Sequence, residues 1–93
     1  MSLYIKEDIP FFHDYDYRYI REVRRLRNFT LSEFSSYMKT DVADLSRLEN
    51  GLLPFSVHYQ SKFHEALKEL SVSNLELISV QRIIELKQQR GIK

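Results

Sequence analysis

Apolar residues recur along the chain at spacings of three and four, the pattern of amphipathic helices, and no stretch alternates as a strand does. We therefore expect an all-α chain with five helices. The first is predicted to run from Asp14 or Asp16, either of which can cap it, to Arg27. Its inward stripe is expected to comprise Tyr19 or Ile20, Val23 and Leu26.

A capping-box pattern marks the start of the second helix. The Thr30 hydroxyl can accept from the N–H of Glu33, whose carboxylate can reach back to the N–H of Thr30. Phe34 and Met38, four residues apart, are then expected to face inward. A short turn over residues 38–41 ends the helix.

The third helix is predicted over residues 42–50, with Asp41 as its N-cap. Leu45 and Leu48 lie three residues apart and are expected to anchor it to the core. Gly51 follows where a helix often ends in the left-handed conformation.

Two longer helices complete the prediction. Ser56 is the expected cap of the fourth, and Ser73 with Glu76 forms a second capping box for the fifth. The fifth can continue to Arg90, where Gly91 terminates it. The inward stripe of the fourth is expected to be Tyr59, Phe63, Leu67 and Leu70.

These elements suggest three segments: an aromatic-rich N-terminal arm over 1–13, a domain over 14–73, and a C-terminal helix over 74–93. The last helix is apolar over a wider arc than a small domain needs, which predicts a homodimer. The arm and this helix are also candidate surfaces for another protein. The residues expected at the dimer contact are Leu75, Ile78, Ile83, Ile84 and Leu86.

Composition limits the possible classes of protein. The 93 residues suit one small core, and the absence of Cys excludes disulfide scaffolds and Cys-based zinc sites. No apolar run is long enough to cross a membrane, and charged residues interrupt the N-terminal stretch where a signal peptide would be apolar. We expect a cytoplasmic protein.

The net charge of +1 does not by itself indicate nucleic acid, but its distribution is uneven. The first helix is rich in arginine, against a single Glu22. This pattern fits either one anion-facing side or an ordinary solvated helix face. The arginines are Arg18, Arg21, Arg24, Arg25 and Arg27.

Residues 28–51 read NFTLSEFSSYMKTDVADLSRLENG. The Thr30 cap, Phe34, the short turn and the ending Leu-Ser-Arg-Leu-Glu-Asn-Gly together resemble the Cro/CI-type repressors, also called the XRE family. The resemblance extends over roughly residues 17–80. It implies a compact five-helix lambda-repressor-like helix-turn-helix domain, extended here by the arm and the C-terminal helix.

The resemblance implies a sequence-specific DNA-binding transcriptional regulator, a repressor, that acts as a homodimer on double-stranded DNA. Burial of Leu45 and Leu48 turns the opposite face of the third helix toward the major groove. Arg47 can pair with guanine or form a surface salt bridge, and Val42 can touch a thymine methyl or join the core. The candidate base-reading residues are Val42, Ala43, Asp44, Ser46 and Arg47.

Phosphate contacts are expected at the start of the second helix, where N–H groups near Thr30 and Leu31 are free. The resemblance implies Thr30 and Asn50 as phosphate ligands, and Arg25 and Lys39 can add charge. It also pairs Arg24 with Glu49 as a structural ion pair.

Two departures from the family pattern leave an alternative open. Lys39 stands where the family usually has Gly, and the apolar residues 52–55 replace a basic loop. The chain is therefore alternatively a protein-protein interaction module that uses a helix-turn-helix scaffold to bind another regulator.

An enzyme is not expected. His58 and His64 are six residues apart on one helix and cannot share a metal, and two Gly cannot build a phosphate loop. We predict no cofactor and no metal site.

Overall fold

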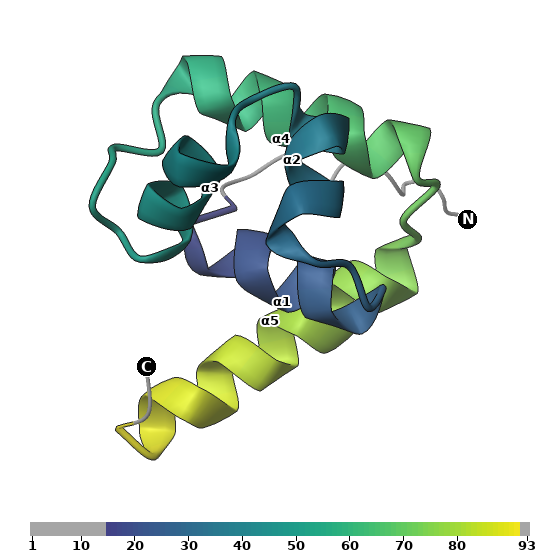
Figure 1. Ribbon diagram of the computed structural model, residues 1–93. Helices are drawn as coiled ribbons and strands as arrows, with labels where there is room; N and C mark the ends of the chain where they lie inside the picture. The colour runs from purple at the N-terminus through teal and green to yellow at the C-terminus, as the bar shows by residue number, and fades with distance from the viewer. Residues whose placement is uncertain (1–14, 92–93) are drawn as a thin grey trace.

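A computed structural model describes residues 15–91 of the chain, and these form five α-helices (Figure 1). The all-α class predicted from the sequence is confirmed. The arm over 1–13 and the candidate cap Asp14 lie outside the described residues. The helices are α1 (Arg18–Leu26), α2 (Leu31–Met38), α3 (Val42–Glu49), α4 (Val57–Glu69) and α5 (Asn74–Gln89).

Local capping signals determine where α5 begins and ends. The Ser73 hydroxyl accepts from the Glu76 N–H at 3.1 Å, and Glu76 Oε1 accepts from the Ser73 N–H at 2.8 Å. Arg90 is the C-cap, and Gly91 follows with a φ of 71°. Both signals are those expected from the sequence.

Two helix starts differ in detail from the prediction. Helix α1 has Tyr17 as its N-cap, one residue after Asp16. Asp16 still serves this end, because its Oδ1 accepts from the Arg18 N–H at 2.8 Å. Ser56 occupies the N-cap of α4, but its side chain makes no capping hydrogen bond.

The helices pack in two groups that share α3. Helix α1 packs against α5 and α3, while α2 packs against α3 and α4. In Figure 1, α5 runs below α1, and α4 lies on the opposite side of the molecule. Helix α3 is thus held from two sides, by α2 and α1, and its remaining side faces outward.

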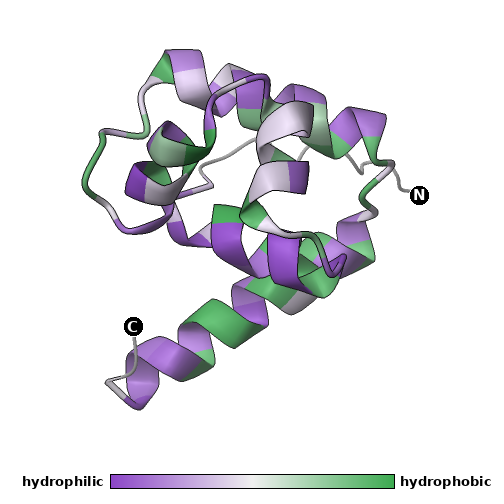
Figure 2. Ribbon diagram, viewed as in Figure 1, coloured by the Kyte–Doolittle hydropathy of each residue, from purple (hydrophilic) through white to green (hydrophobic). Residues whose placement is uncertain are grey.

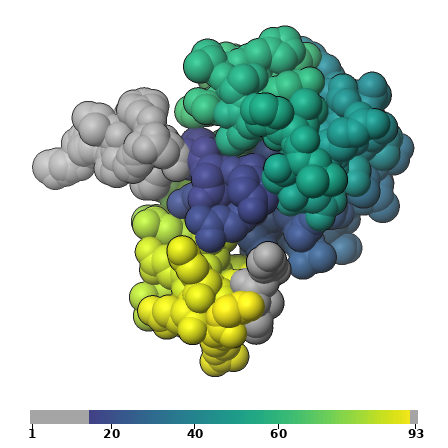
Figure 3. All heavy atoms as spheres, turned by 90° about the vertical axis from the view of Figure 1, so that its left-hand side faces the viewer, coloured from purple at the N-terminus to yellow at the C-terminus, as the bar shows by residue number. Residues whose placement is uncertain are grey.

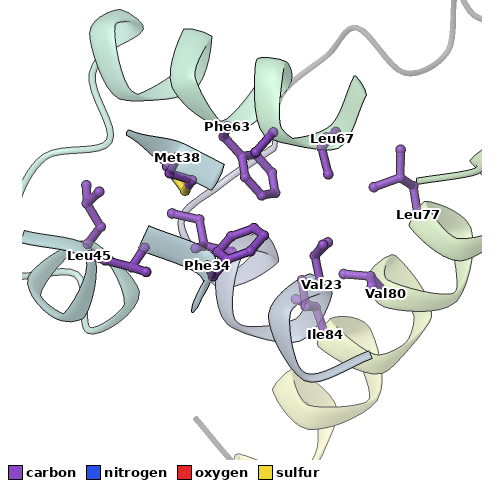
Figure 4. Close-up of a cluster of buried hydrophobic side chains, with 12 residues drawn as sticks. Val23, Phe34, Met38, Leu45, Phe63, Leu67, Leu77, Val80 and Ile84 are labelled. Carbon is purple, nitrogen blue, oxygen red and sulfur yellow. The ribbon is translucent and has the colours of Figure 1, made fainter. Parts of the chain in front are cut away.

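All five helices contribute side chains to one core (Figure 4). Phe34 and Phe63 are fully buried, and their rings lie nearly at right angles with centroids 6.4 Å apart. Burying a side chain of this size contributes about 1.5–3 kcal/mol. The other residues without exposed surface are Ile20, Val23, Met38, Leu45, Leu48, Ala66 and Val80.

Helix α5 belongs to this core, so it is more than an appended dimerisation element. Leu77, Val80 and Ile84 are buried in the core cluster, where α5 packs against α1. The expectation that Ile84 contacts a second copy is therefore wrong, because it shares the inward side of the helix with Leu77, seven residues earlier. Ile84 is only 7% exposed, whereas Leu75 is 73% exposed.

The outward apolar residues of α5 remain accessible. Leu75, Ile78 and Leu86 are exposed, and Ile83 is half-buried. Leu75 and Ile84 lie nine residues apart, about two and a half turns, which places them on opposite sides of the helix. Figure 2 shows apolar (green) residues along α5, among hydrophilic ones.

The end of α1 differs from the predicted stripe. Leu26, expected to face inward, is 43% exposed, because it is the last residue of a helix whose buried face is formed by Ile20 and Val23. Arg27 instead ties this end to the start of α5, with Nε 2.6 Å from Glu76 Oε2. This hydrogen bond, with that from the Ser73 N–H, lowers the pKa of Glu76 to about 2.

Candidate nucleic-acid interface

The unit of α2, the turn and α3 begins with a closed capping box. The Thr30 hydroxyl accepts from the Glu33 N–H at 3.1 Å, and Glu33 Oε1 accepts from the Thr30 N–H at 2.8 Å. The N–H groups of Leu31 and Ser32 have no hydrogen-bond partner among residues 15–91. These two donors are available to an anion, with the helix dipole behind them.

Lys39 forms the turn in the left-handed conformation, with φ 54° and ψ 46°. The N–H groups of Lys39 and Thr40 donate back to the carbonyls of Ser36 and Ser35 at 3.3 and 3.1 Å, which closes the end of α2. A side chain in this conformation costs roughly 1–2 kcal/mol. The turn therefore forms with Lys39 at a position whose left-handed backbone Gly would adopt without steric cost.

Helix α3 separates a buried face from an exposed one. Asp41 Oδ1 accepts from the Asp44 N–H at 2.7 Å and caps the helix as expected. Leu45 and Leu48 have no exposed surface, whereas Val42 is 41% exposed. Val42 is therefore not a core residue, and the alternative considered for it is wrong.

Two of the expected base-reading residues pair with each other. Arg47 Nη1 donates to Asp44 Oδ1 at 2.7 Å, which is the surface salt bridge left open for Arg47. The Arg47 side chain is still 54% exposed, so water and a ligand can reach the pair. Exposed pairs of this kind contribute about 0–1 kcal/mol. Ala43 is exposed and Ser46 is half-buried.

Asn50, an expected phosphate ligand, is the C-cap of α3, and its amide is engaged at both ends. Its Nδ2 donates to the Ser46 carbonyl at 2.8 Å, and its Oδ1 accepts from Arg21 Nη2 at 2.8 Å. Sequence reasoning did not identify Arg21 as a partner of this helix. The available signal is its spacing, because Arg21 lies three residues before Arg24 on one side of α1.

The ion pair expected between Arg24 and Glu49 is present. Arg24 Nε lies 2.7 Å from Glu49 Oε2 and Arg24 Nη2 lies 2.9 Å from Oε1, while the carboxylate is only 2% exposed. The hydrogen bonds that Arg24 donates to the Glu49 carboxylate raise the pKa of Arg24 above its ordinary value. Arg21 Nε also approaches Oε1 at 3.4 Å. One carboxylate thus ties two arginines of α1 to the end of α3.

The expected phosphate ligands do not form one cluster. Thr30 and Lys39 lie at opposite ends of α2, whose eight residues span about 12 Å along the axis. The Lys39 carbonyl accepts from Lys62 Nζ of α4 at 2.7 Å, which places the turn beside α4. Arg25 is exposed on α1 and has no side-chain partner within 15–91.

The exposed charges near α3 are mixed. Glu33, Asp41 and Asp44 carry carboxylates on α2 and at the start of α3, and Arg47 is the cation of α3 itself. Attraction to a phosphate backbone depends on cations that displace counterions. The mixture of charges on this surface therefore gives one copy no strongly cationic face.

The chain matches no family model, no curated protein and no solved structure with which it was compared. Between residues 15 and 91, no helix is both long and apolar enough to span a bilayer. The candidate interface is thus defined by its own geometry: the exposed face of α3 and the free N–H groups at the start of α2.

Proposed function

We propose that the protein binds double-stranded DNA through α3 as a sequence-specific transcriptional regulator, and that it represses by occupying a promoter. The main support for this proposal is that one face of α3 is exposed to solvent. Burial of Leu45 and Leu48 turns Val42 and Arg47 outward. A major groove about 12 Å wide admits one helix with such side chains.

Base reading depends mainly on Arg47. Its guanidinium has to exchange the Asp44 carboxylate for the O6 and N7 acceptors of guanine. Breaking an exposed pair costs about 0–1 kcal/mol, whereas a bidentate contact with guanine gives about 1–3 kcal/mol of discrimination. The released Asp44 can accept from a cytosine amino group, and Val42 and Ala43 can contact thymine methyl groups.

Phosphate binding is assigned to the start of α2 and the end of α3. The free N–H groups of Leu31 and Ser32 suit one phosphate, with the Thr30 hydroxyl beside them. The Glu33 carboxylate at the same end opposes this contact through its negative charge. Asn50 can supply the second hydrogen of its Nδ2, because only one is needed for the bond to the Ser46 carbonyl. One subunit then binds weakly, and a second is needed.

The second subunit is proposed to pack on the outward side of α5. An antiparallel pair of α5 helices related by a two-fold axis near Val80 sets Leu75 against Leu86 of the other copy. The same register sets Ile78 against Ile83. This apolar sequence is therefore complementary to itself, as a two-fold interface requires.

A second function is favoured by a different observation. Leu52 and Val57, on either side of the loop after α3, are 74% and 76% exposed. Apolar residues at this position, with carboxylates on α3, suit a protein partner better than a phosphate backbone. A hetero-complex that persists at high salt without DNA binding would select this alternative.

The proposed function is tested by fluorescence anisotropy with labelled random-sequence duplexes of about 30 base pairs, because non-specific binding depends on the phosphate contacts. Affinity is expected to fall about tenfold for every two phosphates neutralised as salt rises from roughly 50 to 200 mM. Lys68→Ala, on the exposed side of α4, is the control and should leave the affinity unchanged. No binding at the lower salt concentration would contradict the proposal.

A further inference from the structure

A cleft of about 450 Å³ opens between α1, the end of α3 and the last turns of α5. Figure 3 shows the face of the molecule on which these segments meet. Its volume falls within the range of small-molecule sites, about 300–1,000 Å³. Its lining includes Tyr17, Arg18, Arg21, Glu49, Ile84 and Lys87.

The charges around this cleft do not balance. Arg18 pairs with Asp16 at 2.6 Å, Lys87 with Glu22 at 2.5 Å, and Arg24 with Glu49 at 2.7 Å. Each of these cations has a carboxylate within hydrogen-bond distance. Arg21 has no carboxylate of its own among residues 15–91, because the one that it contacts, at 3.4 Å, is the Glu49 already paired with Arg24. Counted over the described residues, these four cations face three carboxylates, which leaves one surplus positive charge beside the cleft, at Arg21.

Arg21 also has unused donors. A guanidinium carries five N–H groups, and Arg21 directs one to Glu49 and one to Asn50. Its side chain is 26% exposed, so a ligand in the cleft can reach the others. A carboxylate or phosphate matches such a fork of donors in both charge and geometry.

We propose that this cleft binds a small organic anion whose acidic group pairs with Arg21 and whose apolar body lies toward Tyr17 and Ile84. Tyr17, which is 38% exposed, borders the cleft from the start of α1, and Ile84 contributes a small apolar part of its lining from α5. Glu22 and Glu49 also line the cleft and repel a second negative charge. The preferred ligand is therefore a monoanion.

A ligand in this cleft should also change DNA binding by α3. This consequence rests on the proposed function. Arg21 holds the Asn50 side chain, which in that function contacts a phosphate. An anion on Arg21 neutralises the positive charge beside this contact, so it should weaken DNA binding. The ligand site itself is tested without DNA, so its failure is distinct from a failure to bind DNA.

The test uses benzoate as the probe and neutral benzamide, which has nearly the same shape, as its matched control. ¹⁵N-labelled protein is titrated with each and followed by NMR chemical shifts. Benzoate is expected to give saturable shifts centred on Tyr17, Arg21, Ile84 and Lys87. Loss of a charge-assisted hydrogen bond predicts affinity for benzamide lower by about tenfold or more.

Arg21→Gln is expected to reduce benzoate affinity by a similar factor, whereas Lys68→Gln, which removes a positive charge outside the cleft, should not. Arg24 keeps Glu49 paired in the first variant, so the fold should be retained, and the protein's NMR spectrum checks this. Equal binding of the two probes, shifts scattered over the surface, or undiminished binding by Arg21→Gln would each overturn the proposal. If the variant unfolds, the comparison of benzoate with benzamide on the unmodified protein still tests whether the cleft selects an anion.

Discussion

Replacing Glu49 by Ala is expected to destabilise the protein by about 3 kcal/mol. Removing one partner of a buried ion pair typically costs about 3–5 kcal/mol, because the other charge remains buried. The lower end applies here, since Arg24 is 14% exposed and keeps a hydrogen bond of 3.0 Å to the Phe29 carbonyl. Arg21, at 26% exposure, can also turn toward water.

For a chain of this size, each kcal/mol shifts the melting temperature by roughly 4–8 °C, so a decrease of about 12–24 °C is predicted. Circular dichroism during thermal and urea unfolding measures both quantities. Glu65→Ala is the matched control, because Glu65 is exposed on α4 and forms no ion pair among residues 15–91. Its effect should stay within about 0.5 kcal/mol.

A double variant, Arg24→Met with Glu49→Met, separates the charge effect from the loss of packing. Two apolar side chains of similar volume often replace a buried pair without loss of stability, so most of the stability should return. A decrease in melting temperature of less than about 2 °C in Glu49→Ala would refute the reasoning. A double variant that is less stable than Arg24→Met alone and Glu49→Met alone would refute it as well.

The Arg27–Glu76 pair should appear in the pH dependence of stability. Hydrogen bonds from Arg27 and the Ser73 N–H lower the pKa of Glu76 from 4.5 to about 2, so its contribution is present above pH 4.5 and lost as pH falls toward 2. Over this window the melting temperature should fall more steeply in the unmodified protein than in Glu76→Gln; parallel curves would contradict this. Lys39→Gly should raise the free energy of unfolding in urea by about 0.5–1 kcal/mol, because Gly relieves the left-handed strain; a lower value would show the strain is absent. Leu75→Glu and Ile78→Glu should each shift sedimentation from dimer to monomer without unfolding the domain, and an unmodified protein that sediments only as a monomer would exclude the α5 interface.

The helix boundaries follow from signals that are local in the sequence. Both capping boxes, at Thr30 and Ser73, form as predicted, because each needs only residues three apart. The burial of Leu45 and Leu48 follows from spacing in the same way. The left-handed Lys39 follows from its position in a short turn, although Lys is not the residue that this conformation favours.

Features that depend on tertiary packing were harder to predict. Ile84 and Leu86 are both apolar residues of the last helix, and only the position of α1 decides which one is buried. The exposure of Leu26 depends likewise on where α1 stops. Arg21 was missed because its contacts with Glu49 and Asn50 join residues 28 and 29 positions apart. Periodicity places a residue on a face but does not identify its distant partners.

Selection of bound sequences from random duplex DNA, carried out in parallel with Arg47→Ala, tests the role of α3 most directly. The unmodified protein should enrich an inverted repeat whose half-sites are about 34 Å apart, one turn of the duplex. The Arg47→Ala variant should retain this repeat but lose its preference at one guanine, by about 1–3 kcal/mol. Failure to enrich any motif, or an identical motif from both proteins, would contradict the assignment of α3 as the helix that reads DNA.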